Sequence, residues 1–133
     1  MTHIPKIIIK PVFPENQRYS TCGDYIYDRE DDTLTIFVSR MADWRSELAV
    51  AIHELFESVE CLAADIELTD IDEFDMQFER DRSAGKHSET DEPGDDKEAP
   101  YHKSHVSATF VEREVCSRTG LNWVQHESNV NEA

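Results

Sequence analysis

The first forty residues contain three short runs of β-branched and aromatic residues, the types that favour extended strands. The first run, residues 6–10, lies between two prolines, which cannot donate to a strand ladder, so an edge strand is expected there. Residues 25–27 and 33–38 form the other two runs, and the acidic stretch 28–32 between them is typical of a hairpin loop. The β-rich segment 1–40 therefore predicts a small antiparallel sheet.

A helical periodicity begins after the predicted sheet. Asp43 is a typical N-cap, and the helix that it would start is predicted over residues 43–64. The apolar residues of this segment recur every three or four positions, which predicts that they form the buried face: Trp44, Leu48, Ile52, Leu55, Val59 and Leu62. His53, Glu57 and Glu60 fall on a neighbouring stripe of the same helix.

The segment that follows is dominated by charged residues. A shorter helix is predicted over residues 70–78, and its apolar side chains available for packing are Ile71, Phe74 and either Met76 or Phe78. Residues 80–100 contain almost no apolar side chains, which predicts an acidic surface loop.

A second long helix is predicted over residues 104–119. Ser104 can cap its beginning, and Gly120 stands where a left-handed residue would end it. Residues 126–133 are expected to fray. The whole pattern predicts an α+β fold, in which a small antiparallel β-sheet packs on two long helices with a long acidic loop between them.

Composition limits both the size and the partners of this fold. A chain of 133 residues is long enough for one hydrophobic core, so a single domain over residues 1–133 is expected. The formal net charge of −16 repels phosphate groups, which argues against binding to nucleic acids and to anionic membranes. Cations and basic partners are favoured by this charge, unless the acidity serves only to keep the protein soluble.

The cysteines and the N-terminal segment indicate where the protein resides. Three cysteines without a CxxC pair do not suit a disulfide-stapled secreted domain. The apolar run at residues 7–9 is too short for a signal-peptide core or a membrane span. We therefore expect a soluble protein of the cytoplasm.

The strongest chemical signal is the HExxE sequence of His53, Glu54 and Glu57 on the first predicted helix. It resembles the HExxH helix of the zincin metallopeptidases, in which residues four apart bind zinc and the intervening glutamate activates water. By this resemblance His53 and Glu57 are candidate metal ligands, and Glu54 is the candidate catalytic base. A glutamate replaces the second histidine, so a further nitrogen ligand has to come from elsewhere in the chain.

The second predicted helix can supply that ligand. His105 and Glu112 lie on one stripe of it, together with Thr109 and Cys116. Two histidines and two carboxylates, His53, Glu57, His105 and Glu112, would suit a divalent metal between the two helices, with zinc favoured over manganese and iron.

Other interpretations of these residues remain open. The histidines could be buried and hydrogen-bonded next to a solvated acidic face, with no metal. Five further residues could join the site: Asp72, Asp75, Asp95, Asp96 and His102. A cysteine nucleophile is not favoured, because carboxylates nearby would raise the pKa of a thiol.

The order of these motifs also resembles small uncharacterised proteins of bacteriophages and prophages. The similarity covers roughly residues 48–125, and its segments are His53-Glu54-Leu55-Phe56-Glu57, Asp72-Glu73-Phe74-Asp75, Glu92-Pro93-Gly94-Asp95-Asp96, Ala99-Pro100-Tyr101 and His105-x-x-Ala108-Thr109-x-x-Glu112-Arg113. The resemblance implies a phage-encoded accessory protein in the cytoplasm of a bacterial host, and it implies no particular activity.

Three functions follow from these observations. The first is a zincin-like metal-dependent hydrolase acting on a peptide or an amide. The second is an interaction protein without enzymatic activity, whose acidic surface binds a basic host or phage protein and whose metal, if any, is structural. The third is a nucleotide pyrophosphohydrolase, in which Glu54-x-x-Glu57 and Glu67-x-x-Asp70 would bind magnesium.

Overall fold

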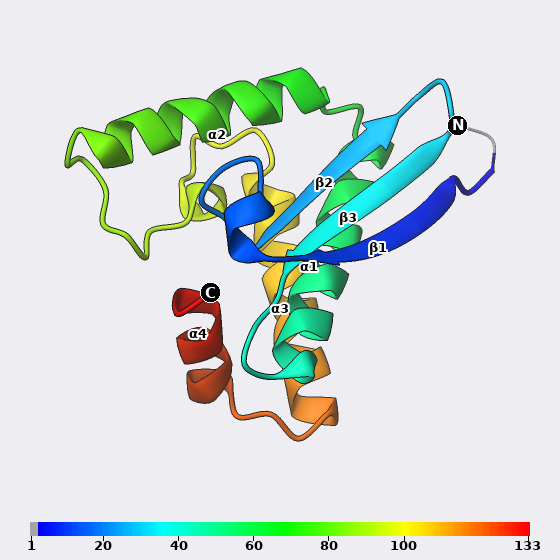
Figure 1. The fold of residues 1–133 in the computed structure, drawn as a ribbon. Coiled ribbons are helices and arrows are strands. Elements are labelled where there is room, and N and C mark those ends of the chain that lie inside the picture. The colour runs from blue at the N-terminus through cyan, green and yellow to red at the C-terminus, as the bar shows by residue number, and fades with distance from the viewer. Residues whose placement is uncertain (1–2) are drawn as a thin grey trace.

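A three-stranded mixed sheet forms one layer of the protein, which we describe from a computed structural model over residues 3–133. The strands β1 (Lys6–Val12), β2 (Gly23–Asp28) and β3 (Thr33–Ser39) are arranged in the order β1-β3-β2 (Figure 1). The predicted β2–β3 hairpin and the edge position of β1 are confirmed.

The prediction of a purely antiparallel sheet is wrong, because β1 pairs with β3 in parallel. After β1 the chain passes through the short 3-10 helix η1 (Pro14–Asn16) and returns as β2, which leaves room for one strand between β1 and β2. The hairpin then brings β3 back into the vacant position between them, so β3 runs in the same direction as β1. Pro11 is tolerated inside β1 because this strand is at the edge of the sheet.

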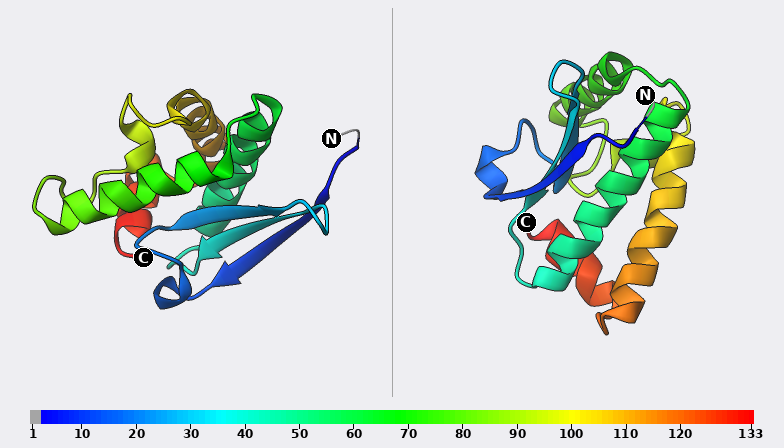
Figure 2. Two further views of the ribbon diagram at one scale, coloured as in Figure 1. Left: turned by 90° about the horizontal axis from the view of Figure 1, so that it is seen from above. Right: turned by 90° about the vertical axis from the view of Figure 1, so that its right-hand side faces the viewer.

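The α-helices of the described residues gather on one face of this sheet (Figure 2). Leu34, Ile36 and Val38 of β3 alternate with partly exposed residues and are at most 2% exposed, as expected for a strand with one covered face. The helix α1 (Trp44–Ala63) packs against them, and α3 (His102–Arg118) lies beside α1 and antiparallel to it (Figures 1 and 2). Among the described helices, none has an apolar stretch long enough to cross a lipid bilayer.

The buried face of α1 differs from the one predicted. Asp43 caps the helix as expected, since its carboxylate accepts a hydrogen bond from the Arg45 backbone N–H at 2.9 Å. The predicted apolar stripe is only partly covered, however, and Trp44 is 66% exposed. The buried positions are mostly small or polar: Ser46, Ala49, Val50, Ala51, His53, Glu57, Ser58 and Cys61. Small side chains on this face let α1 approach its neighbours closely, and this proximity encloses the two polar residues predicted to bind metal.

The segment between α1 and α3 is more ordered than a surface loop. The helix α2 (Leu68–Ser83) extends past the predicted end at residue 78, and buries Ile71 and Phe78 while Met76 stays exposed. The 3-10 helix η2 (Pro93–Asp95) follows, and its Gly94 and the nearby Ala99 are buried. Part of the predicted surface loop 80–100 therefore belongs to the interior.

The C-terminal part of the chain adds a helix that was not predicted. Gly120, with φ of +76°, follows the end of α3 as expected, whereas Ser104 is buried inside α3 and does not cap it. The helix α4 (Trp123–Asn131) is capped by Asn122, whose side chain accepts hydrogen bonds from the backbone N–H groups of Val124 and Gln125. The expectation that residues 126–133 fray is therefore wrong for residues 126–131.

The contact between α1 and α3 should be sensitive to added volume. Ala108 of α3 is fully buried on the stripe that also carries His105 and Glu112, so an Ala108→Leu change forces α1 and α3 apart. We expect a loss of about 1–3 kcal/mol in the free energy of unfolding, measured by urea denaturation. The control Ser117→Leu, at an exposed position of the same helix, should change stability by less than about 0.5 kcal/mol. An equal loss of unfolding free energy in Ala108→Leu and Ser117→Leu would contradict this packing of α1 on α3.

Candidate metal centre

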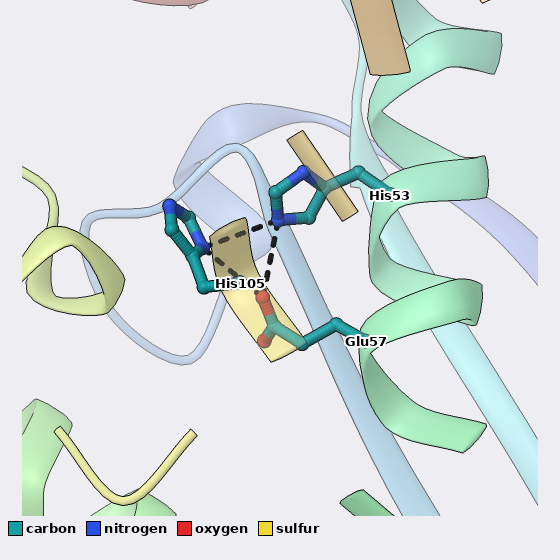
Figure 3. A group of neighbouring side chains, drawn as sticks. All are labelled: His53, Glu57 and His105. Carbon is teal, nitrogen blue, oxygen red and sulfur yellow. Dashed lines mark hydrogen bonds and ion pairs between the residues drawn. The ribbon is translucent and has the colours of Figure 1, made fainter. Parts of the chain in front are cut away.

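Three side chains from two helices meet between α1 and α3 (Figure 3). His53 and Glu57 lie one turn apart on α1, and His105 reaches them from α3. His53 Nε2 is 3.1 Å from Glu57 Oε2 and 3.2 Å from His105 Nδ1, and His105 Nδ1 is 3.1 Å from the same Glu57 oxygen. All three residues are buried, with 4–7% of their surface exposed. We call these three residues the triad.

Protons alone satisfy this triangle of atoms poorly. A carboxylate oxygen only accepts, so each imidazole can donate a proton to Glu57. The two ring nitrogens would then face each other at 3.2 Å with a proton on both and no acceptor between them. A cation between the three atoms would satisfy all of their lone pairs at once.

The spacing of the triad matches what a metal ion requires. Ligand atoms around a tetrahedral zinc ion, at zinc–ligand distances of about 2.0–2.1 Å, are about 3.3 Å apart. The three distances in the triad, 3.1–3.2 Å, are close to this value. The cluster of His53, Glu57 and His105 could therefore hold a metal ion.

The outer nitrogens of both imidazoles face carboxylates. His53 Nδ1 is 2.7 Å from Glu112 Oε1, and His105 Nε2 lies 3.3 Å from Glu92 Oε2 and 3.2 Å from Asp95 Oδ1. These contacts are short, although the oxygens lie off the directions of good ring hydrogen bonds. Carboxylates in this outer position are typical of metal-binding histidines, because they hold the ring and keep its inner nitrogen available.

The carboxylates control the protonation of the triad. Burial lowers the pKa of His53, but Glu112 and Glu57 outweigh burial and raise that pKa to about 11. For His105 the same balance of burial against Glu57 and Glu92 raises the pKa to about 10. Both imidazoles are therefore protonated at neutral pH without a metal, and a metal has to displace those protons in order to bind.

Glu54 lines the cavity next to the triad. Its side chain packs on Gly23 of β2, where a Cβ atom would come within 2.6 Å of Glu54 Cγ, so only glycine leaves room for it. Burial and the nearby Glu57 raise the pKa of Glu54 well above its ordinary value. The cavity has a volume of about 360 Å³, and its lining includes Glu54 and all three triad residues.

The remaining candidates lie outside the triangle of atoms formed by His53 Nε2, His105 Nδ1 and Glu57 Oε2. Glu112, predicted as a fourth ligand, contacts the far side of the His53 ring instead, and Asp95 lies on the outer side of His105. Asp72 forms an ion pair with an arginine, and the Asp96 carboxylate accepts a bond from a backbone N–H two residues on. His102 Nδ1 is within hydrogen-bonding distance of the Gly94 carbonyl oxygen.

Asp75 occupies a separate position in the cavity wall. Its carboxylate accepts hydrogen bonds from the hydroxyl groups of Tyr19 and Tyr101, at 2.9 and 2.6 Å. Burial raises the pKa of Asp75 to about 6. It is therefore a buried acidic group near the triad, and its hydrogen-bond partners are the two tyrosines.

The cysteines are unsuited to act as nucleophiles. All three are free thiols, and burial raises the pKa of Cys22 to about 12 and of Cys116 to about 11, so few thiolates form at neutral pH. His126, for which no function was predicted from the sequence, is almost completely buried and contacts Glu112. The Asn122 cap was the available signal that His126 lies on a helix and not in a frayed tail.

Comparisons with models of protein families, with curated proteins and with solved structures found no match. The interpretation of the site therefore depends on its geometry and chemistry.

Glu112 should make the metal-free protein sensitive to acid. Burial raises the pKa of Glu112, but His126 and His53 outweigh it and lower the pKa from 4.5 to about 2. A lowered carboxylate pKa stabilises the fold above pH 4.5, and this contribution is lost as the pH falls toward 2. We expect the metal-free protein to lose on the order of 3 kcal/mol of unfolding free energy across this window.

Urea denaturation at pH 5 and pH 3 measures this effect. The Glu112→Gln variant should show a smaller loss between the two pH values than the unaltered protein, because it has no carboxylate at this position. Glu114→Gln, at an exposed position of the same helix, is the control and should leave the pH dependence unchanged. The same pH dependence in all three proteins would contradict the assignment.

Proposed function

We propose that this chain binds a divalent metal ion, with zinc preferred, and that it is a metal-dependent hydrolase. The observation that carries the proposal is the triad, in which His53 Nε2, His105 Nδ1 and Glu57 Oε2 converge within 3.1–3.2 Å of one another. Two imidazole nitrogens and one carboxylate oxygen are ligands that zinc binds in hydrolases. Manganese and iron accept the same donors and are the other candidates.

Three protein ligands favour a catalytic site over a purely structural one. Structural zinc sites use four protein ligands, whereas catalytic sites use three and leave a position for water or substrate. The triad borders a cavity of about 360 Å³, which offers space for a substrate. A metal at this site would polarise a carbonyl group and increase the acidity of a bound water molecule.

Glu54 is the residue that we propose as the general base. It lies next to His53 on α1 and lines the same cavity as the triad. Its raised pKa in the metal-free protein would fall when a cation binds nearby, which would leave the carboxylate able to accept a proton from water. A peptide or another amide is the proposed substrate class, in a phage-encoded accessory protein of the bacterial cytoplasm.

The ligands can be tested by metal analysis. Protein prepared without a histidine tag and incubated with zinc should hold about one ion per chain, measured by elemental analysis after extensive dialysis. His53→Ala, Glu57→Ala and His105→Ala should each remove most of this zinc, because each deletes one of three ligands. His87→Ala, at a histidine outside the triad, should retain it. Zinc retained by all the triad variants would contradict the site.

The catalytic role of Glu54 can be separated from metal binding. A Glu54→Gln variant should bind zinc like the unaltered protein but cleave about 10²–10⁴-fold more slowly. The assay incubates zinc-loaded protein with a complex peptide mixture and detects new termini by mass spectrometry. Glu114→Gln is the matched control and should cleave normally. If the Glu54→Gln variant cleaves peptides at the same rate as the unaltered protein, Glu54 is not the base.

A structural metal is the second candidate, because the triad residues are almost completely buried and join two helices. A metal would then clip α1 to α3 in an acidic protein that binds a basic partner. A metal bound at the triad raises stability with either function, because it binds the folded protein. Peptide cleavage distinguishes the two functions, because a structural metal gives none.

The pyrophosphohydrolase hypothesis has weaker support. It requires Glu67 and Asp70 to act together with Glu54 and Glu57, but the Glu67 carboxylate is exposed and pairs with Arg29. Glu54 and Glu57 line the cavity at the triad, whereas Glu67 lines a different one. We therefore do not favour a magnesium site built from both motifs.

A further inference from the structure

The helix α4 buries a histidine that the proposed reaction does not use. His126 is 1% exposed, and it lies between two polar partners from other helices. Its Nε2 is 2.5 Å from Glu112 Oε2 of α3, and its Nδ1 is 3.0 Å from Ser46 Oγ of α1. Burying an imidazole in this way is costly unless each donor meets an acceptor.

The surrounding donors and acceptors determine which nitrogen of His126 carries the proton. Gln125 Nε2 donates to Asn129 Oδ1, so the Asn129 amide turns its Nδ2 toward Ser46 and donates to Ser46 Oγ. Because Ser46 Oγ accepts this bond, its own proton is available for His126 Nδ1. His126 then carries a proton on Nε2 and donates it to Glu112.

Glu112 connects this network to the triad. Its second oxygen, Oε1, lies 2.7 Å from His53 Nδ1, so one carboxylate is shared by two histidines on opposite sides. This oxygen lies off the direction of a good ring hydrogen bond. Its negative charge at 2.7 Å still favours the form of His53 that keeps its proton on Nδ1. The lone pair of His53 then stays on Nε2, the nitrogen that belongs to the triad.

We propose that His126 is a positioning residue of the metal site, which acts through Glu112 to fix the orientation and tautomer of His53. By this proposal α4 is part of the site although it supplies no atom of the triad. The inference rests on the proposed metal-binding function.

A role in holding α4 in place does not explain a histidine at this position. Other residues already attach the helix: Trp123 lies under the guanidinium of Arg113, 4.4 Å from its carbon to the ring centroid, and Val130 packs against the main core. An apolar side chain would fill the position of His126 without any need for buried hydrogen-bond partners. An apolar residue cannot donate a hydrogen bond to Glu112.

A pair of substitutions tests this role. The Nε2 of glutamine can take the place of the Nε2 of histidine, so His126→Gln keeps a donor for Glu112. Asparagine is shorter, so His126→Asn keeps a polar group near Ser46 but does not reach Glu112. We expect zinc affinity to fall about 10–100-fold in His126→Asn and to stay within a few-fold of the unaltered protein in His126→Gln.

Competition with a chromophoric zinc chelator measures these affinities, and the visible spectrum of the cobalt-loaded proteins reports the geometry of the site. The control Val130→Ala removes an apolar contact of α4 but keeps every side chain of the network, and it should lose stability but keep zinc affinity. Equal affinity of His126→Asn and the unaltered protein would overturn the inference alone. So would an equal loss of affinity in Val130→Ala. Absence of zinc binding by the unaltered protein would overturn the proposed function and this inference together.

Discussion

The burial of the triad between α1 and α3 is the constraint on which the rest of the structure depends. Imidazole and carboxylate groups lose hydration when they are buried, so their cost has to be offset by partners inside the protein. Small residues such as Ala49 and Ala108, both fully buried, let the two helices approach closely enough for His105 to reach His53 and Glu57. The contact between α1 and α3 is therefore built around a polar group of side chains, beside an apolar core that includes Leu34, Ile36 and Val38 of the sheet.

Each neighbouring element contributes something to that group. The sheet covers α1 on one side, and its residue Gly23 leaves the space that Glu54 occupies. The loop with η2 brings Glu92 and Asp95 to the outer nitrogen of His105. The α4 helix places a buried histidine against Glu112, which in turn contacts His53. The acidic residues closest to the triad are thus arranged around its histidines, and this arrangement is what favours binding of a cation.

Much of this could be predicted from the sequence where the signal was local. The Asp43 cap and the β2–β3 hairpin depend on short segments, and the spacing of His53 and Glu57 on one helix places them together automatically. That His105 would meet them was a longer step, taken from the stripe on the second helix. It succeeded because two antiparallel helices with small buried residues present their polar stripes to each other.

The failures come from interactions that no local pattern encodes. The parallel pairing of β1 depends on the path that the chain takes before β2. The spacing of the apolar residues in α1 does not show which face of this helix the sheet and α3 cover. Glu112 was expected to be a ligand because it lies on the same stripe of α3 as His105. The spacing of residues along a helix does not show that Glu112 contacts Nδ1 of His53, the nitrogen that faces away from the triad. His126 was missed because the helix after Gly120 has only nine residues, and its three apolar residues, Trp123, Val124 and Val130, are too few to show a helical period.

Binding of one metal ion by His53, Glu57 and His105 is tested most directly by X-ray diffraction from zinc-loaded crystals, measured on both sides of the zinc absorption edge. We expect a single anomalous peak enclosed by His53 Nε2, His105 Nδ1 and Glu57 Oε2, at about 2.0–2.2 Å from each atom. A peak at any other position, or imidazole and carboxylate groups that keep their mutual contacts with no peak between them, would contradict this binding site.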